Sequence, residues 1–211
     1  MSSSRIVGWL AAAALSLVAL GAHAQAAKAP EALIKEVSTE VLDAVKADKT
    51  IQAGDIRKVI GLVDQKVLPY VNFERMTASA VGRYWRQATP EQQKRLQDEF
   101  KVLLVRTYSG ALSQVSAEQS VDLKPMRSAP GDAEVVVRTE IRGKGDPIQL
   151  DYRLEKAGAG WKIYDVNVMG VWLVENYRNS FAQEIGSNGI DGLIAKLAER
   201  NKAANAGGKQ S

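Results

Sequence analysis

The spacing of the apolar residues changes near Ser116. Before that point they recur every three or four residues, which places them on one face of an α-helix. After it they alternate with polar residues, as in β-strands that have one buried face. A helical half followed by a stranded half predicts an α+β domain, in which helices pack on the apolar face of an antiparallel sheet.

The helical half contains several predicted helices with recognisable starts. Asp55 is a suitable N-cap for one helix, and a short helix is expected to begin near Asn72. The clearest helix follows Thr89, with Pro90 at the first position and Gln92 completing a capping box, and should run about 25 residues. Another is predicted from an apolar stripe near the start of the chain, formed by Ile34, Val37, Val41 and Val45.

The stranded half predicts a meander of about four antiparallel strands, joined by turns rich in glycine. These strands are expected at residues 121–123, 135–141, 148–154 and 161–168. Two helices, at about 171–185 and 190–201, should close the chain. The fold class is therefore a curved sheet of about four strands, packed on one side by about six or seven helices.

The last predicted strand breaks its own alternation. Trp161 and Ile163 have one parity, whereas Tyr164, Val166 and Val168 have the other. A β-bulge at Ile163 and Tyr164 would turn all five side chains to the inner face and would curve the sheet. A strand that is simply buried on both faces is an equally good interpretation.

The first 24 residues have the features of a signal peptide. Arg5 precedes an apolar run at Ile6–Leu20, and Ala22-His23-Ala24 fits a cleavage site. A membrane anchor is the alternative, but it needs about 20 apolar residues and this run is shorter. The expected division of the chain is a signal peptide at 1–24, a flexible lead at 25–30, a single domain at 31–202 and a disordered tail at 203–211.

Cleavage would remove His23, the only histidine, from a chain that has no cysteine. A cysteine or Ser-His-Asp nucleophile system and the usual zinc sites are then excluded, as are disulfides and a lipid-modified cysteine. Loss of Arg5 leaves a net charge of +3, which is too mild to indicate nucleic-acid binding. We therefore expect an exported, soluble protein without a metal or a cofactor.

Paired carboxylates are the remaining route to catalysis, because an Asp and a Glu can hydrolyse sugars without histidine or cysteine. Asp165 and Glu175 are candidates, but no spacing rule supports them, and most acidic residues lie beside Lys or Arg on predicted polar faces. An exported carboxylate-dependent hydrolase stays an alternative. A structural envelope adaptor with a solid core is another.

Four stretches together resemble one known family: VLPYVNFERMTASAVGRYWRQATPEQQKRLQDEFKVLLVRTYSGAL (residues 67–112), LDYRL, GWKIYDVNVMGVWLVENYRNSF and GIDGLIAKL. The chain is similar to the MlaC family, also called toluene-tolerance auxiliary proteins, which are periplasmic phospholipid carriers of Gram-negative bacteria. The resemblance covers nearly the whole mature chain, in order and with similar spacing. This family often has a small polar residue where this chain has Trp172.

The resemblance implies a hydrophobic cavity for acyl chains, with the headgroup near the surface, and no enzymatic activity. The cargo would be a phospholipid with two or more acyl chains. The implied partners are an outer-membrane lipoprotein–porin complex and the MCE-domain subunit of an inner-membrane ABC transporter. The implied role is to carry phospholipid between the two membranes and so maintain outer-membrane lipid asymmetry.

In such a cavity the lining should come from inward-facing strand positions and the helix faces above them. The residues expected to bind lipid are Phe100, Leu104, Tyr108, Val137, Ile141, Leu150, Tyr152, Tyr164, Val166, Val168, Val171 and Val174. A basic rim that meets the phosphate is expected from Arg83, Arg86 and Lys144.

Overall fold

The computed structural model describes residues 28–127, 129, 131–158 and 160–207. The signal peptide expected at 1–24 lies outside these residues. The α-helices are α1 (Pro30–Ala47), α2 (Lys49–Gln52), α3 (Ile56–Lys66), α4 (Phe73–Val81), α5 (Pro90–Ser109) and α6 (Leu173–Gly207). Short 3-10 helices lie between them: η1 (Leu68–Tyr70), η2 (Gly82–Gln87) and η3 (Gly110–Gln114). The strands are β1 (Ser120–Leu123), β2 (Glu134–Arg142), β3 (Ile148–Ala157), β4 (Gly160–Val168) and β5 (Val171–Trp172).

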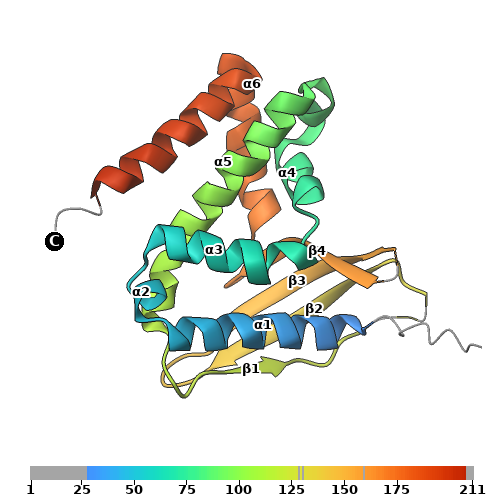
Figure 1. Cartoon of the computed structure of the whole chain (residues 1–211). Coiled ribbons are helices and arrows are strands. Elements are labelled where there is room, and N and C mark those ends of the chain that lie inside the picture. The colour runs from blue at the N-terminus through green and yellow to red at the C-terminus, as the bar shows by residue number, and fades with distance from the viewer. Residues whose placement is uncertain (1–27, 128, 130, 159, 208–211) are drawn as a thin grey trace, which may run out of the picture.

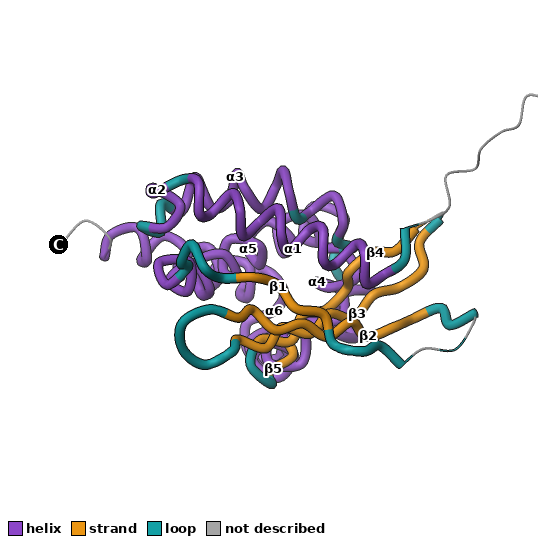
Figure 2. Tube along the Cα trace, turned by 90° about the horizontal axis from the view of Figure 1, so that it is seen from below, coloured by secondary structure: helices purple, strands orange, loops and turns teal. Residues whose placement is uncertain are grey.

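The strands form one antiparallel sheet in the order β1-β2-β3-β4-β5, so each pairs with its neighbour in sequence. Helices α1, α3 and α5 lie over one face of this sheet, as the view from below shows (Figure 2). The predicted α+β architecture and its four-stranded meander are confirmed. β5 is an addition: residues 171 and 172 extend a hairpin with β4, and α6 begins one residue later.

The predicted helix starts are also present. The side chain of Asp55 accepts hydrogen bonds from the first turn of α3, and that of Asn72 does so for α4. Thr89 and Gln92 form both bonds of the capping box at the start of α5. These signals were readable because a cap depends on residues that are adjacent in sequence.

The last helix, α6, has a kink at Gly189, where φ is 71° and ψ is −179°, and this kink falls between the two helices predicted at about 171–185 and 190–201. Its two arms run in different directions (Figure 1). The first arm packs against α4 and α5, and the second packs back along α5. The helix continues to Gly207, past the expected helix end near 201.

The β-bulge in β4 is present, but it directs Tyr164 differently from the prediction. Arg153 pairs with Asp165 and Leu154 pairs with Ile163, so Tyr164 is the extra residue. Its hydroxyl donates a hydrogen bond to Glu134 on the outer face of the sheet, at 2.9 Å. The inward position expected for Tyr164 is therefore wrong: Tyr164 and Asp165 share the outer face, and Ile163 remains inside.

Within the described residues, the buried side chains form three clusters. One joins α4, α5 and α6, where the ring of Phe100 meets those of Tyr177 and Phe181 edge-on at centroid distances of 5.1 and 5.3 Å. The second packs α1 on the sheet, and the third joins the C-terminal half of α1 to α2, α3 and α5. In the part of the chain that the structure describes, no helix has the length and apolar character needed to cross a membrane.

Candidate binding pocket

A pocket of about 290 Å³ lies between these clusters, enclosed by α3, α5 and β4 with contributions from the neighbouring elements. Its volume is close to the lower end of the range for ligand pockets, roughly 300–1,000 Å³. The lining residues are Val41, Val59, Leu62, Val63, Val67, Leu68, Val71, Phe73, Met76, Lys101, Leu104, Val105, Tyr108, Ser109, Leu112, Val166, Val168 and Leu173.

Two helices supply opposite parts of the wall. On α3, Val59, Leu62 and Val63 have the spacing of one helical face. On α5 and η3, the lining positions are again three or four residues apart, and they end at Leu112. Because Asp55 and the Thr89 capping box set where these helices begin, local sequence signals position both walls.

The sheet supplies Val166 and Val168 from β4. The bulge at Tyr164 is what places them there, since without the extra residue these positions would have the parity of the outer face. Val166 packs against both the α4–α5–α6 cluster and the α1–sheet cluster. The bulge in β4 therefore turns the side chains of Val166 and Val168 toward the pocket.

Polar groups are sparse in this wall. Of the described residues that line the pocket, Lys101 is the only charged one, and its Nζ lies 2.8 Å from Oδ1 of Asp64 on α3. Burial of the Tyr108 phenol raises its pKa above the ordinary value, so this group is neutral at neutral pH. The pocket can hold an apolar ligand, but it offers little to a polar one.

Four residues predicted to bind lipid do line this pocket: Leu104, Tyr108, Val166 and Val168. Three others are buried in the clusters around it, namely Phe100, Val137 and Val174. Sequence spacing placed these three on the correct faces, but it could not separate a side chain in a packed core from one facing a cavity.

The remaining predicted contacts lie elsewhere on or near the sheet. Ile141, Leu150 and Tyr152 lie on its inner face outside the pocket wall, and the Tyr152 hydroxyl is 3.3 Å from that of Ser38. Val171 is 48% exposed beside the β4–β5 turn. Like Tyr164, which faces outward, these residues do not line the pocket.

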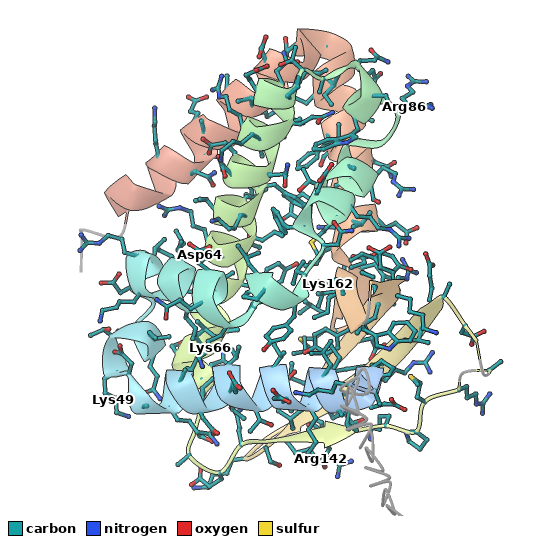
Figure 3. All side chains as sticks on the ribbon, turned by 45° about the vertical axis from the view of Figure 1, so that its right-hand side comes forward. Lys49, Asp64, Lys66, Arg86, Arg142 and Lys162 are labelled. Carbon is teal, nitrogen blue, oxygen red and sulfur yellow. The ribbon has the colours of Figure 1, made fainter. Side chains whose placement is uncertain are left out.

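The predicted basic rim also lies away from the pocket. Arg83 and Arg86 belong to η2, beyond the end of α4, and Arg86 is far from Asp64 on α3 (Figure 3). Lys144 lies in the β2–β3 turn and pairs with Glu118 at 3.2 Å. None of the three lines the pocket.

Sequence analysis missed the contribution of α3 and of Lys101. The apolar stripe on α3 was visible in the sequence, but a stripe of this kind is ordinarily core. In the sequence, Lys101 is a lysine at the spacing of the apolar face of α5. A lysine at this spacing is the sequence feature that could have indicated a charge directed toward the cavity.

Of the two carboxylates considered for catalysis, Asp165 has a structural role. Asp165 is buried and accepts hydrogen bonds from Arg153 and from the backbone N–H groups of Val166 and Val174. Glu175 is exposed on α6. Nowhere in the described ranges do three or more His, Cys, Asp or Glu residues gather as a group that could hold a metal ion.

Trp172, at the position where the resembling family often has a small polar residue, has a defined contact. The guanidinium carbon of Arg153 lies 3.8 Å from the centre of its ring. This cation–π contact is on the outer side of the sheet, away from the pocket wall. The tryptophan therefore supports the Arg153–Asp165 ion pair and does not shape the cavity.

The sequence profile of the family described as MlaC protein matches residues 35–199. The toluene tolerance protein Ttg2D of Pseudomonas putida is 28% identical over 186 residues, which cover 85% of this chain and 86% of that protein. The intermembrane phospholipid transport system binding protein MlaC of Haemophilus influenzae is 24% identical over 174 residues, 81% of each chain.

Among solved structures, the phospholipid-binding protein from Ralstonia solanacearum, determined in complex with a phospholipid, superposes with a TM-score of 0.79. It is 47% identical in sequence, and the match covers 83% of this chain and 98% of that one. The similarity thus extends over the sheet and the helices that enclose the pocket.

Proposed function

Because the chain belongs to the MlaC family, we propose that it binds the acyl chains of a phospholipid in this pocket and carries the lipid between the outer and inner membranes. One observation carries the proposal: an almost wholly apolar pocket lies in a chain that is 47% identical to a structure holding a phospholipid. The contacts we propose for the acyl chains include Leu104, Tyr108, Val166, Val168 and the α3 face.

The energetics suit a carrier. Exposing about 30 methylenes of two acyl chains to water costs on the order of 25 kcal/mol, at about 0.8 kcal/mol each. A lipid therefore needs an apolar enclosure outside the bilayer. Since the same contacts are lost when the lipid leaves a membrane, transfer into an apolar pocket can be nearly neutral, and loading and release are both feasible.

The proposed place of action is the periplasm, after cleavage of residues 1–24. The proposed partners are an outer-membrane lipoprotein–porin complex and the MCE-domain subunit of an inner-membrane ABC transporter, as the family membership implies. The role would be to maintain the lipid asymmetry of the outer membrane. The proposal includes no chemical step, and the cargo leaves as it arrived.

Co-purification tests this function directly. The mature chain is exported to the periplasm of a Gram-negative host, purified without detergent and studied by native mass spectrometry, and its lipids are extracted. We expect intact phospholipid bound at a fixed ratio. Protein that holds no lipid would favour the adaptor alternative, and release of lysolipid or free fatty acid on incubation would favour a hydrolase.

A further inference from the structure

One charged side chain interrupts an otherwise apolar helix face. The lining positions of α5 and η3 are Lys101, Leu104, Val105, Tyr108, Ser109 and Leu112. Lys101 stands at one end of this row. Helical rise puts it roughly 18 Å from Leu112 along the axis, since α5 ends at Ser109 and Leu112 belongs to the 3-10 helix η3.

That length matches the proposed cargo. The hydrocarbon core of a bilayer is about 30 Å thick, so the acyl chains of one leaflet span about 15 Å. A lipid whose chains lie along α5 as far as Leu112 would bring its polar end to Lys101. The row therefore has a direction, with the polar end at Lys101 and the apolar end at Leu112.

Lys101 is held by a partner that can be exchanged. Its side chain is 22% exposed and that of Asp64 is 43% exposed, and their ion pair bridges α5 and α3. Partly exposed pairs of this kind are weak, because water screens both charges. A phosphate diester presents two oxygens that share one negative charge, so it can bind the same ammonium group in place of the carboxylate.

We propose that Lys101 binds the phosphate of the lipid headgroup in place of Asp64, and that Asp64 neutralises Lys101 when the pocket is empty. This inference rests on the proposed function and adds the polar end of the site. Asp64 would keep the ammonium paired in the empty protein, through an ion pair that is weak enough to be exchanged because both groups are partly exposed. The displaced Asp64 carboxylate stays beside Lys101 and can pair with it again, so release remains possible.

Other basic residues offer no equivalent position. Lys94 on the same helix pairs with Asp98 and is 76% exposed, outside the pocket. Lys66, near Asp64 in sequence, pairs with Glu40 on α1 and is likewise not a lining residue. Among the described lining residues only Lys101 combines a cation with contact to the cavity.

The test compares two lipids that have the same acyl chains and differ in the phosphoglycerol headgroup. Delipidated protein is incubated with nonionic detergent micelles containing equimolar dioleoyl phosphatidylglycerol and dioleoylglycerol, and the bound lipids are counted by mass spectrometry. The variants are Lys101→Met and Asp64→Asn, with Lys94→Met as the matched control. A parallel sample contains excess inorganic phosphate.

We expect wild type and Lys94→Met to prefer the phospholipid, and Lys101→Met to lose this preference by about tenfold, the size that one net charge-assisted hydrogen bond gives. Uptake of dioleoylglycerol by Lys101→Met should equal that of wild type. Asp64→Asn should increase the preference, since it removes the competing anion. Inorganic phosphate should not release lipid, because it has no acyl chains to place in the pocket.

An unchanged preference in both Lys101→Met and Asp64→Asn would overturn the assignment of Lys101 while leaving lipid binding intact. Release of bound phospholipid by inorganic phosphate would instead show a general anion site. If wild type took up neither lipid, the proposed function itself would fail. The outcomes therefore separate the two proposals.

Discussion

Oδ1 of Asp165 accepts a hydrogen bond from the backbone N–H of Val174 at 3.1 Å, so a residue of β4 caps the first turn of α6. The same carboxylate binds Nη1 of Arg153 at 3.1 Å. Asp165 thus ties the edge of the sheet to the long helix that closes the domain. The alternation along β4 places Asp165 on the outer face and so predicts an exposed side chain. Alternation cannot show that β5 and α6 cover the outer face at Asp165 and bury it.

Asp165→Ala should therefore destabilise the fold by about 2–4 kcal/mol, since it leaves a buried N–H and a partly buried guanidinium without their acceptor. Asp165→Asn keeps an acceptor for Val174 and should cost less. Urea denaturation followed by circular dichroism measures both. Equal midpoints for Asp165→Ala and wild type would show that the cap contributes nothing to stability.

Stability should fall in acid partly through Glu134. Hydrogen bonds from Arg75, and then from Tyr164, lower the pKa of Glu134 below its ordinary value. A carboxyl with a lowered folded pKa stabilises the protein above its unfolded pKa, and this contribution is lost as the pH falls through the folded value. Because the Glu134 side chain is 51% exposed, we expect less than about 1 kcal/mol from it.

Glu134→Gln should accordingly lower the free energy of unfolding at pH 7 and lower it by less at about pH 3, because the native residue loses its charge as the pH falls through its lowered folded pKa. Asp165 has the opposite effect on the pH dependence of stability. Burial raises its pKa, so its ionisation lowers the free energy of unfolding as the pH rises through the folded pKa. Denaturation midpoints across this range separate the two groups. If Glu134→Gln lowered the free energy of unfolding equally at both pH values, the charge of Glu134 would not be the source of its contribution to stability.

A charge inside the pocket should prevent loading. Val168→Glu places a carboxylate in the apolar wall and should reduce bound phospholipid by roughly tenfold or more. Val171→Glu is the matched control, because that side chain is 48% exposed and outside the wall. Native mass spectrometry of both variants and wild type gives the ratio of lipid to protein. Equal loading in Val168→Glu and Val171→Glu would remove Val168 from the acyl site.

The kink in α6 should depend on Gly189. Its φ of 71° and ψ of −179° lie in a region that is almost restricted to glycine, so Gly189→Ala should cost about 1–3 kcal/mol. Gly61→Ala in α3 is the control: it meets no atom within 4 Å and has ordinary helical φ, so it should stabilise by about 0.5–1 kcal/mol. Thermal unfolding of both variants should therefore shift in opposite directions.

Much of the fold was predictable because its signals are local. The Thr89–Gln92 capping box and the Asp55 and Asn72 caps each satisfy backbone groups within three residues. Alternation along β2 and β3 likewise marked the inner face correctly. The pocket was harder to predict from the sequence. Leu104 and Val168 were predicted as lining residues, but the α3 wall was not, because apolar stripes that face a core and those that face a cavity have the same period.

Period, caps and turns in the amino-acid order predicted the α+β class and the meander, and they made a bulge one of two interpretations of the last strand. The family resemblance came from four particular stretches of residues. Three-dimensional packing alone decided that Tyr164 faces Glu134, that Asp165 caps α6 and that Lys101 meets Asp64 at the pocket. The physical reason is the distance along the chain. Helix and strand formation depends on neighbours a few residues apart, whereas the direction of a bulged side chain or the partner of a charge depends on segments that only folding brings together.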